Sequence, residues 1–420
     1  MFLNANKFLS LTCIFLPILM ITGPAIPDII ISLCGLFFIL NIIIENKYEY
    51  LRDKIFLLFV LFWGSLVFSC LISDYLILSI SSSIFYIRFI FFILFIKYYA
   101  SKFLFIQKYY LLILTFTIIF VSLDSLIQSY YGVEVFGNLK SESNQYRLDG
   151  PFGGREWIVG SFISTYFAIC IAYLYSLKID NIKNKNFIII VSFLLFYFVT
   201  FISGERMAFI MMNFIIFIFL LTNKKYILNF IKTLIIIFPI VLISFTLNNS
   251  FFDRFLSTFD VIGININGEN DNNNFWDSHY GSHYLTTIEI FKNKPLIGAG
   301  PKSFREECKK EEYSTINSKL ANIRCSTHPH NFYFQILSEV GLIGFALFLV
   351  FNLYILIHFF QYYKNNSFIF ISIYLSILAF LWPIKSTGNI LNNRYALFFY
   401  YLVMLMIIFI EKNKYMQRKN

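Results

Sequence analysis

The sequence predicts an all-α polytopic membrane protein, and two observations carry this prediction. Of the 420 residues, 58% are hydrophobic and only 14% are charged, whereas soluble globular proteins have roughly 25% charged residues. The apolar runs repeatedly reach the roughly 17–25 residues that cross a bilayer as a helix. Together these observations exclude a soluble enzyme, a nucleic-acid-binding domain and a disordered chain.

Taken in order, the apolar runs indicate about twelve membrane spans. Two of them, 8–22 and 233–247, are short for a full span and also fit tilted or re-entrant segments. The expected spans are 8–22, 25–44, 55–73, 76–96, 109–131, 157–177, 187–203, 206–222, 233–247, 332–360, 368–383 and 395–411.

The basic residues orient these spans. They follow the second, fourth, sixth, eighth and last spans, which all end on the same side if twelve are counted. The positive-inside rule assigns that side to the cytoplasm, so both termini are expected there. The same bias explains the net charge of +10 without a nucleic-acid partner. These residues are Lys47, Arg52, Lys54, Lys97, Lys102, Lys108, Lys178, Lys183, Lys185, Lys224, Lys225, Lys232, Lys412, Lys414, Arg418 and Lys419.

Two loops are expected on the opposite, outer face, and they divide the chain into three parts. Residues 1–247 form N-terminal spans with a short outer loop at 132–156, residues 248–331 form a large outer loop, and residues 332–420 form the C-terminal spans. The large loop is polar, but the apolar spacing of 283–294 predicts a helix, which Pro295 ends.

Cysteine placement agrees with this topology. Cys308 and Cys325 both lie in the large outer loop, where an oxidising compartment permits a disulfide. Such a bond would stabilise the loop by roughly 3 kcal/mol on the chain-entropy model. Two unpaired thiols remain the alternative. The other cysteines lie in spans and are most simply small buried residues.

Four arginines are candidates for binding an anion, because ionisable groups near membrane depth are costly and need a reason. Arg88 lies inside the fourth span; it either snorkels, forms a structural pair or faces an anionic ligand. Arg206, with Glu205, lies at an outer junction between two spans and is either a ligand residue or half of a solvated charge pair. Arg147 precedes a glycine- and proline-rich turn of the small outer loop and, with Arg155, suits phosphate. Arg305 and Lys302 follow the turn GAGP in the large loop.

The segment HPHN, residues 328–331, is the strongest candidate for chemistry. Pro329 favours extended backbone at His328, and Asn331 is a good N-cap for the following helix. His330 is thereby held at the mouth of a membrane helix, where a neutral imidazole suits a general base. A capping or structural histidine is the alternative. Glu339 lies eight residues beyond Asn331, about 12 Å along a straight helix, and is expected to orient or pack that helix.

Metal binding is a weaker interpretation of the histidines. His279 and His283 are four residues apart and, with His328 and His330, would give a four-histidine site. Without a carboxylate or cysteine at matching spacing, this is poor evidence for zinc. We therefore expect no metal and no other cofactor.

In this order and topology, the motifs resemble those of the O-antigen ligase and O-antigen polymerase superfamily of bacterial envelope proteins. The most specific is His330-Asn331, nine residues, then Gly341-Leu-Ile-Gly344. PLIGAGPKSF, SGERMAF and RLDGPFG are similar to the family's loop segment, span-end arginine motif and first-loop arginine motif. The resemblance covers the whole chain.

The resemblance implies a GT-C-like glycosyltransferase of the bacterial inner membrane that acts on the periplasmic face. Its donor would be a glycan on undecaprenyl pyrophosphate, and its acceptor lipid A–core in a ligase or a second lipid-linked repeat in a polymerase. His330 would be the base, and Arg206 and Arg147, then Arg88 and Arg305, would bind pyrophosphate. His328, Asn331, Glu205 and Glu339 would support them, with membrane lipids as the surroundings and without metal or nucleotide sugar.

Other functions remain open at this point. A protein O-oligosaccharyltransferase would share the same histidine and arginines. A transporter of lipid-linked glycans would not need HPHN and would favour duplicated halves, and no internal repeat is evident. A structural membrane subunit leaves Arg88 and the ordered outer loop unexplained.

Overall fold

The computed structural model describes residues 2–100, 107–140, 147–153, 157–178, 181–222, 235, 275–362 and 367–419. Within these ranges all regular structure is helical, apart from one isolated bridge between Val133 and Leu139. The α-helices are α1 (Phe2–Thr12), α2 (Leu16–Leu19), α3 (Ala25–Ile44), α4 (Lys54–Ile72), α5 (Leu76–Ser83), α6 (Arg88–Ala100), α7 (Gln107–Tyr131), α8 (Val159–Ser176), α9 (Ile182–Ile202), α10 (Arg206–Thr222), α13 (His279–Asn293), α14 (Phe304–Glu307), α15 (Phe332–Phe360), α16 (Phe368–Phe380) and α17 (Asn393–Lys419). Short 3₁₀ turns, η1 (Cys13–Phe15), η2 (Tyr48–Arg52), η3 (Ile84–Ile87), η6 (Gly150–Phe152), η8 (Phe275–Asp277), η9 (Glu311–Tyr313) and η10 (Ala321–Ile323), connect them.

The polytopic helical class is confirmed. Eight helical segments of the described residues are long and apolar enough to cross a membrane, and three shorter apolar helices accompany them. The expected ranges 25–44, 206–222 and 332–360 coincide with α3, α10 and α15. The expected span 233–247, like Arg155 and the first part of the large loop, lies outside the described residues. The count of twelve therefore stays a prediction.

Besides the expected span 8–22, in which η1 separates α1 from α2, two expected spans are interrupted rather than continuous. The span predicted at 76–96 consists of α5, a 3₁₀ turn at Ile84–Ile87 and α6. The second interruption is inside α15, where Gly341 has non-helical dihedral angles (φ 71°, ψ −171°). Hydropathy does not register either break, because the residues on both sides are equally apolar.

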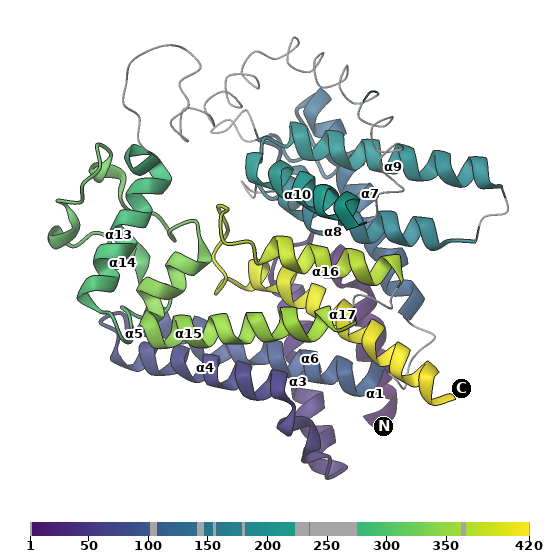
Figure 1. Ribbon diagram of the computed structural model, residues 1–420, viewed down its shortest axis with the longest axis horizontal. Helices are drawn as coiled ribbons and strands as arrows, with labels where there is room; N and C mark the ends of the chain where they lie inside the picture. The colour runs from purple at the N-terminus through teal and green to yellow at the C-terminus, as the bar shows by residue number, and fades with distance from the viewer. Residues whose placement is uncertain are drawn as a thin grey trace.

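The helices pack side by side as a bundle (Figure 1). α3 lies against α6, α4 against α15, and α8 against α7, α9 and α16. A continuous buried core of apolar, largely aromatic side chains joins them. The ends of α1 and α17 that carry the two termini lie on the same side of the bundle (Figure 1).

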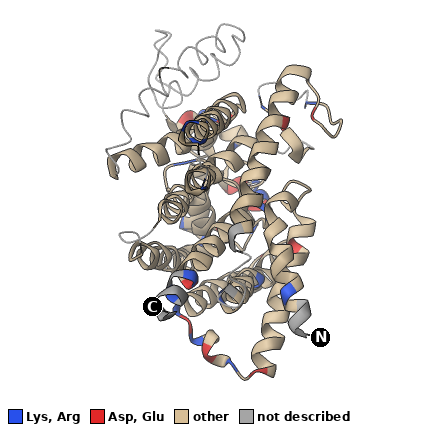
Figure 2. Cartoon of the chain, turned by 90° about the vertical axis from the view of Figure 1, so that its right-hand side faces the viewer, with Lys and Arg blue, Asp and Glu red and all other residues tan. Residues whose placement is uncertain are grey.

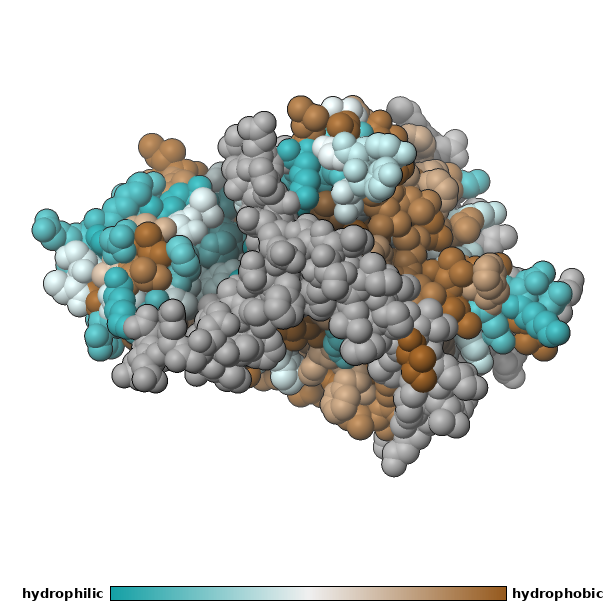
Figure 3. All heavy atoms as spheres, turned by 90° about the horizontal axis from the view of Figure 1, so that it is seen from above, coloured by the Kyte–Doolittle hydropathy of each residue, from teal (hydrophilic) through white to brown (hydrophobic). Residues whose placement is uncertain are grey.

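The surface of the bundle has the polarity that a bilayer requires. Seen from above, a hydrophobic band separates a hydrophilic lobe, formed by the region of α13 and α14, from a smaller hydrophilic end (Figure 3). From the side of the termini, charged residues are sparse on the helices and gather near the C-terminus and in the turn before α4 (Figure 2).

The described part of the large loop, residues 275–331, forms a compact lobe at one end of the bundle (Figure 1). The predicted helix at 283–294 is confirmed as α13, which begins earlier, at His279, where Ser278 caps it. Cys308 and Cys325 form a disulfide with their Cα atoms 5.4 Å apart. α13 packs on α15, and Lys294 and Lys310 form ion pairs with Asp74 of the bundle. The lobe is thus fixed directly over the start of α15.

Candidate active site

His330 occupies the turn just before α15, with its backbone in the left-handed region (φ 57°). Asn331 caps the helix as predicted, because its side-chain oxygen accepts the first backbone N–H groups at 2.9 and 3.2 Å. Thr387 holds the turn from the other side. Its N–H donates to the His330 carbonyl at 2.7 Å, and its hydroxyl accepts the N–H of Phe332 at 2.9 Å. These bonds offset the roughly 1–3 kcal/mol that a sparsely populated backbone conformation costs.

Three imidazoles meet at this turn. The ring of His330 lies 4.3 Å from that of His328 and 5.5 Å from that of His283 of α13, centroid to centroid. Nε2 of His328 donates to the Thr387 carbonyl at 3.2 Å, and its Nδ1 lies 3.0 Å from the Thr327 hydroxyl. Both nitrogens of His328 are therefore occupied by local partners.

The ring nitrogens of His330 have fewer hydrogen-bond partners than those of His328. Its Nε2 lies 3.2 Å from the Ser326 hydroxyl. Nδ1 of His330 has no hydrogen-bond partner in the part of the chain that the structure describes. Of the two histidines in HPHN, His330 is thus the one with a ring nitrogen available to another molecule.

The surroundings keep these imidazoles neutral. Burial, together with the charges of His328, His283 and Arg147, lowers the pKa of His330 to about 3. Burial likewise lowers the pKa of His328 to about 4. Burial also lowers the pKa of His283 below its ordinary value. At neutral pH each ring therefore carries a lone pair.

Two arginines from different elements are linked electrostatically to the surroundings of His330. The guanidinium of Arg147 lies over the indole ring of Trp157, 5.4 Å from its centroid, and its charge acts on His330. Arg206, the first residue of α10, is within electrostatic reach of both Arg147 and Tyr280. The ring of Tyr280 meets that of His330 edge-on at 5.6 Å. Through Arg147 and Tyr280, the imidazole of His330 and the two guanidinium groups are linked as one candidate site.

Glu205 anchors the turn that carries Arg206. Its carboxylate accepts the N–H of Gly160 at 2.6 Å and both the N–H (3.2 Å) and the hydroxyl (2.5 Å) of Ser161, at the start of α8. Carboxylates are favoured at a helix N-terminus. Burial raises the pKa of Glu205 to about 7, which the hydrogen bonds from Ser161 and Gly160 and the charge of Arg147 oppose. Glu205 is thus a positioning residue, not a solvated partner of Arg206.

Glu339 positions the segment that carries Lys302 and Arg305, as Glu205 positions the turn that carries Arg206. Its carboxylate accepts the N–H groups of Lys302 at 2.9 Å and Phe304 at 3.4 Å, and an amide N–H of Gln335 at 2.9 Å. It therefore holds the segment that presents Lys302 and Arg305. The charge of Arg305 reaches both His328 and Lys302.

The break in α15 at Gly341 makes room for the segment PLIGAGP, which leads to Lys302 and Arg305. The N–H groups of Leu342 and Ile343 donate to the carbonyls of Pro295 and Leu296 at 2.8 and 3.2 Å, instead of continuing the helix. The sequence motifs PLIGAGP and GLIG are thus hydrogen-bonded to each other, although about forty residues separate them.

Arg88 is engaged inside the bundle. Its Nε donates to the carboxylate of Asp28 at 2.6 Å, and other guanidinium nitrogens donate to Asn393 at 2.7 Å and to the Phe85 carbonyl at 2.6 Å. Of the three possibilities left open by the sequence, the structure provides a structural pair. A role in binding the substrate is not needed to explain this residue.

Sequence reasoning missed the loop between α16 and α17. Besides Thr387, it contributes Asn389, which accepts an amide N–H of Gln335 at 2.8 Å, and the carbonyls of Pro383 and Lys385, which accept the Asn331 amide at 2.9 and 3.1 Å. The available signal was the cluster of polar residues between two apolar spans, at 385–389.

The weaker metal interpretation required His279, His283, His328 and His330 to converge on one ion. Among the described residues, no group of three or more histidine, cysteine, aspartate or glutamate side chains is arranged to hold a metal ion. His283, His328 and His330 are nevertheless neighbours, and they are arranged as packed rings.

The comparison with known proteins agrees with the motifs. Residues 190–349 match the model of the O-antigen ligase family. No curated protein matched the chain. The matched region contains α10 with Arg206, the outer lobe, His330 and the first part of α15. The match over residues 190–349 thus supports the resemblance of the motifs to the O-antigen ligase and O-antigen polymerase superfamily.

Proposed function

We propose that the protein is an inverting, metal-independent glycosyltransferase of the bacterial inner membrane. It transfers a glycan from undecaprenyl pyrophosphate to an acceptor hydroxyl on the periplasmic face, with lipid A–core as the favoured acceptor. The family supports a ligase- or polymerase-type glycosyltransferase in general. The observation that carries the proposal is the neutral imidazole of His330, on which the charge of Arg147 acts, with Arg206 within electrostatic reach of Arg147 and Tyr280.

In this proposal His330 is the general base. With Nε2–H donated to Ser326, the lone pair of His330 lies on Nδ1. That nitrogen takes the proton of the acceptor hydroxyl while the hydroxyl oxygen bonds to the anomeric carbon. A positioned base of this kind is typically worth 10²–10⁴-fold in rate. Attack from the face opposite the leaving group inverts the sugar configuration.

The leaving group requires the cations. As the bond from the anomeric carbon to the phosphate oxygen breaks, the electron pair stays on the lipid diphosphate. Arg147 and Arg206 neutralise this charge, and guanidinium groups bind phosphate oxygens in a bidentate manner. Cations fixed in advance in a water-poor site stabilise such a transition state strongly. Lys302 and Arg305 supply further positive charge on the His328 side.

The test is the substitution His330→Ala in a strain deleted for the gene. We expect transfer to fall by at least 10²-fold, with the protein still inserted and abundant, because the ring itself donates only to Ser326. His279→Ala is the matched control, since His279 is an exposed histidine of the same lobe. Gel analysis of envelope glycans gives the readout. Normal glycan transfer by the His330→Ala variant would rule out His330 as the general base.

The same gels separate the ligase from the polymerase. Loss of a ligase leaves bare lipid A–core, and lipid-linked polymer accumulates. Loss of a polymerase leaves core that bears a single repeat. Unchanged lipopolysaccharide together with the loss of a protein-linked glycan would indicate a protein acceptor.

A further inference from the structure

The segment that carries Arg147 is held by a side chain of a membrane helix. The backbone N–H groups of Asp149 and Gly150 both donate to Oε1 of Gln128, at 3.0 and 2.9 Å. Gln128 belongs to α7 and is fully buried. A buried backbone N–H group costs free energy unless it finds an acceptor, and one amide oxygen satisfies two of them here. Arg147 is thus two residues away from a backbone position that α7 fixes.

A second side chain on the same face of α7 holds the first part of the small outer loop. Asp124 precedes Gln128 by four residues, so the two side chains are neighbours along the helix. The carboxylate of Asp124 accepts the N–H of Val135 at 2.7 Å. Val135 lies between Val133 and Leu139, which an isolated bridge joins. The outer end of α7 therefore has a buried polar face that binds the loop.

Gly150 allows the segment to approach α7 closely. Its φ is 53°, and a Cβ there would lie 2.7 Å from Oγ of Ser125 and 2.7 Å from a methyl group of Val159, the first residue of α8. Glycine tolerates both the left-handed backbone and the close contact. Any other residue would push the segment away from the two helices and would lengthen its bonds to Gln128.

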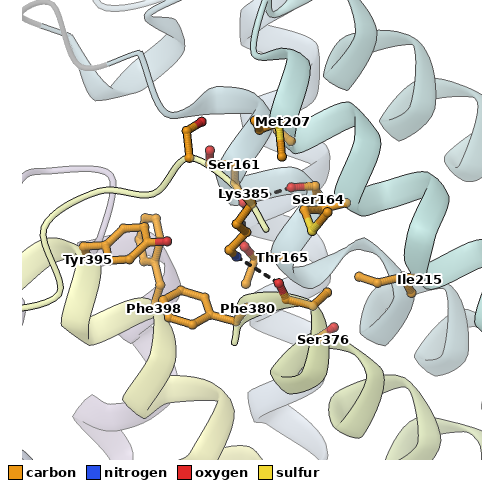
Figure 4. A pocket seen from close by; sticks show the side chains of 14 residues that line it. Ser161, Ser164, Thr165, Met207, Ile215, Ser376, Phe380, Lys385, Tyr395 and Phe398 are labelled. Carbon is orange, nitrogen blue, oxygen red and sulfur yellow. Dashed lines mark hydrogen bonds between the residues drawn. The ribbon is translucent and has the colours of Figure 1, made fainter. Parts of the chain in front are cut away.

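The same segment is also bonded to the turn that presents Arg206. The N–H of Leu148 donates at 3.3 Å to the carbonyl of Ser203, three residues before Arg206. This turn is fixed on α8 by the hydrogen bond from Ser161 to Glu205, and Ser161 lies in the wall of the small cavity beside α10 (Figure 4). The two arginine-bearing segments therefore share a backbone hydrogen bond.

The position of the Arg147 guanidinium depends on the backbone from which it extends. The group lies over the indole ring of Trp157, 5.4 Å from its centroid. Its Nε is buried and has no hydrogen-bond partner in the part of the chain that the structure describes. A displacement of the segment bound to Gln128 would therefore carry the guanidinium with it.

We propose that Gln128 is a positioning residue for the transfer reaction and that it acts through Arg147. Its amide oxygen fixes the backbone just beyond Arg147, and the segment holds the guanidinium where the charge of the leaving diphosphate develops. Gln128 thereby serves Arg147 as Glu205 serves Arg206. The inference rests on the proposed function, in which Arg147 neutralises the leaving group.

The experiment measures kcat and KM with a lipid-linked glycan donor for the purified full-length protein in detergent micelles. Gln128→Met fills the same space but has no acceptor oxygen, whereas Gln128→Glu keeps an acceptor oxygen in either protonation state. Thr117→Val is the matched control, because the Thr117 hydroxyl donates within α7, to the Ile113 carbonyl at 2.8 Å.

We expect Gln128→Met to lower kcat about ten- to a hundredfold and to change KM by less than about threefold, because a displaced charge-stabilising group is felt mainly in the transition state. Gln128→Glu should restore most of the activity, and Thr117→Val should behave as the wild type. A folded Gln128→Met with normal kcat overturns the inference. So does a Gln128→Glu variant that loses as much activity as Gln128→Met, because the acceptor oxygen is then not what matters.

A double-mutant cycle tests whether Gln128 acts through Arg147. In Arg147→Ala the side chain to be positioned is absent, so adding Gln128→Met should lower kcat by no more than about twofold. Losses that multiply in the double variant show an independent structural role. They overturn the inference and leave the proposed function intact.

The Arg147→Ala variant alone tests the proposed function. Normal kcat/KM in this variant would show that the leaving group does not need this cation, and the inference would fall with it. If the thermal midpoint shows that Gln128→Met does not fold, Gln128→Asn takes its place, because it keeps the amide but draws the oxygen back by one methylene. The same cycle with Arg147→Ala then decides.

Discussion

At the scale of single residues, the site depends on keeping an imidazole neutral and two guanidinium groups in place. The depressed pKa of His330, about 3, has its main cause in burial. In water the imidazole titrates near 6.5, so an exposed histidine would be partly protonated at mildly acidic pH. Burial therefore keeps the imidazole neutral at mildly acidic and neutral pH, and it also makes the ring a weaker base than a free imidazole.

The pH dependence of transfer should come from Glu205, not His330. Because the pKa of His330 lies near 3, kcat/KM should show no inflection from this ring between about pH 5 and 8. The pKa of Glu205 is about 7, and only its carboxylate form accepts all of its bonds from α8. As the pH falls through about 7, Glu205 gains a proton, loses acceptor capacity and releases the Arg206 turn. Activity should then decrease.

The variant Glu205→Gln distinguishes a titration of Glu205 from a titration of His330. We expect lower kcat/KM at pH 8 than in the wild type, and no acid limb near pH 7, because the amide does not titrate. If the pH profile of kcat/KM of the Glu205→Gln variant still falls below about pH 6.5, the titrating group is a histidine. The measurement is the pH profile of kcat/KM with a lipid-linked donor.

Arg206 should not be replaceable by lysine. We expect Arg206→Lys to reduce kcat/KM by at least tenfold, because an ammonium lacks the planar fork that binds two phosphate oxygens. Arg324→Lys is a suitable control, since Arg324 donates to backbone carbonyls within the outer lobe. Full activity of Arg206→Lys would argue that its guanidinium is only a structural contact.

At the scale of elements, the break in α15 is the feature that assembles the site. Gly341 has a φ of 71°, and a Cβ there would lie 2.4 Å from backbone atoms of Leu296 and Ile297. No side chain fits without moving the PLIGAGP segment, and that segment leads to Lys302 and Arg305. The backbone conformation at Gly341 thus determines where Lys302 and Arg305 lie.

Gly341→Ala should therefore be destructive. We expect a loss well above about 1 kcal/mol in stability, because the residue combines a left-handed φ with a backbone clash. Gly64→Ala in α4 is the control, because nothing lies within 4 Å of a Cβ there and alanine favours a helix by up to about 1 kcal/mol. Thermal midpoints in detergent give the comparison. Equal midpoints for the two variants would show that α15 can straighten without cost.

At the scale of the whole molecule, the bundle places the site at one end and both termini at the other (Figure 1). The lobe of residues 275–331 lies over the start of α15, and the charged C-terminal residues belong to the last turns of α17. Positive residues near the termini predict that this end is cytoplasmic, and the site is then periplasmic.

Thiol labelling in intact cells tests that orientation. Cys308→Ser frees Cys325, which is half-buried in the lobe, and we expect a membrane-impermeant maleimide to label it from outside once the outer membrane is permeable. Lys414→Cys, in a background without Cys308 and Cys325, should be labelled only after the inner membrane is broken. Cys13, Cys34, Cys70 and Cys170 are buried and serve as internal controls. The opposite labelling pattern would invert the topology.

The sequence by itself determined the helical membrane class, the family and the cap that places His330. These features depend only on residues that are near one another in the sequence. The apolar runs are contiguous, Asn331 caps the helix that it precedes, and the motif is defined by the spacing of its residues. It also indicated Arg147, through the glycine- and proline-rich turn that follows it, and Arg206, through its place at the outer end of a span.

Only the tertiary structure decided which of these residues meet. The pairing of Arg88 with Asp28, the docking of PLIGAGP into the break at Gly341, and the role of Thr387 in holding HPHN all join segments far apart in the chain. Such contacts depend on how buried polar groups find partners in the folded bundle, and hydropathy does not encode that choice. For the same reason the bonds from Asp149 and Gly150 to Gln128 were not predicted, because Asp149 follows Gln128 by 21 positions and hydropathy assigns Gln128 only to an apolar span.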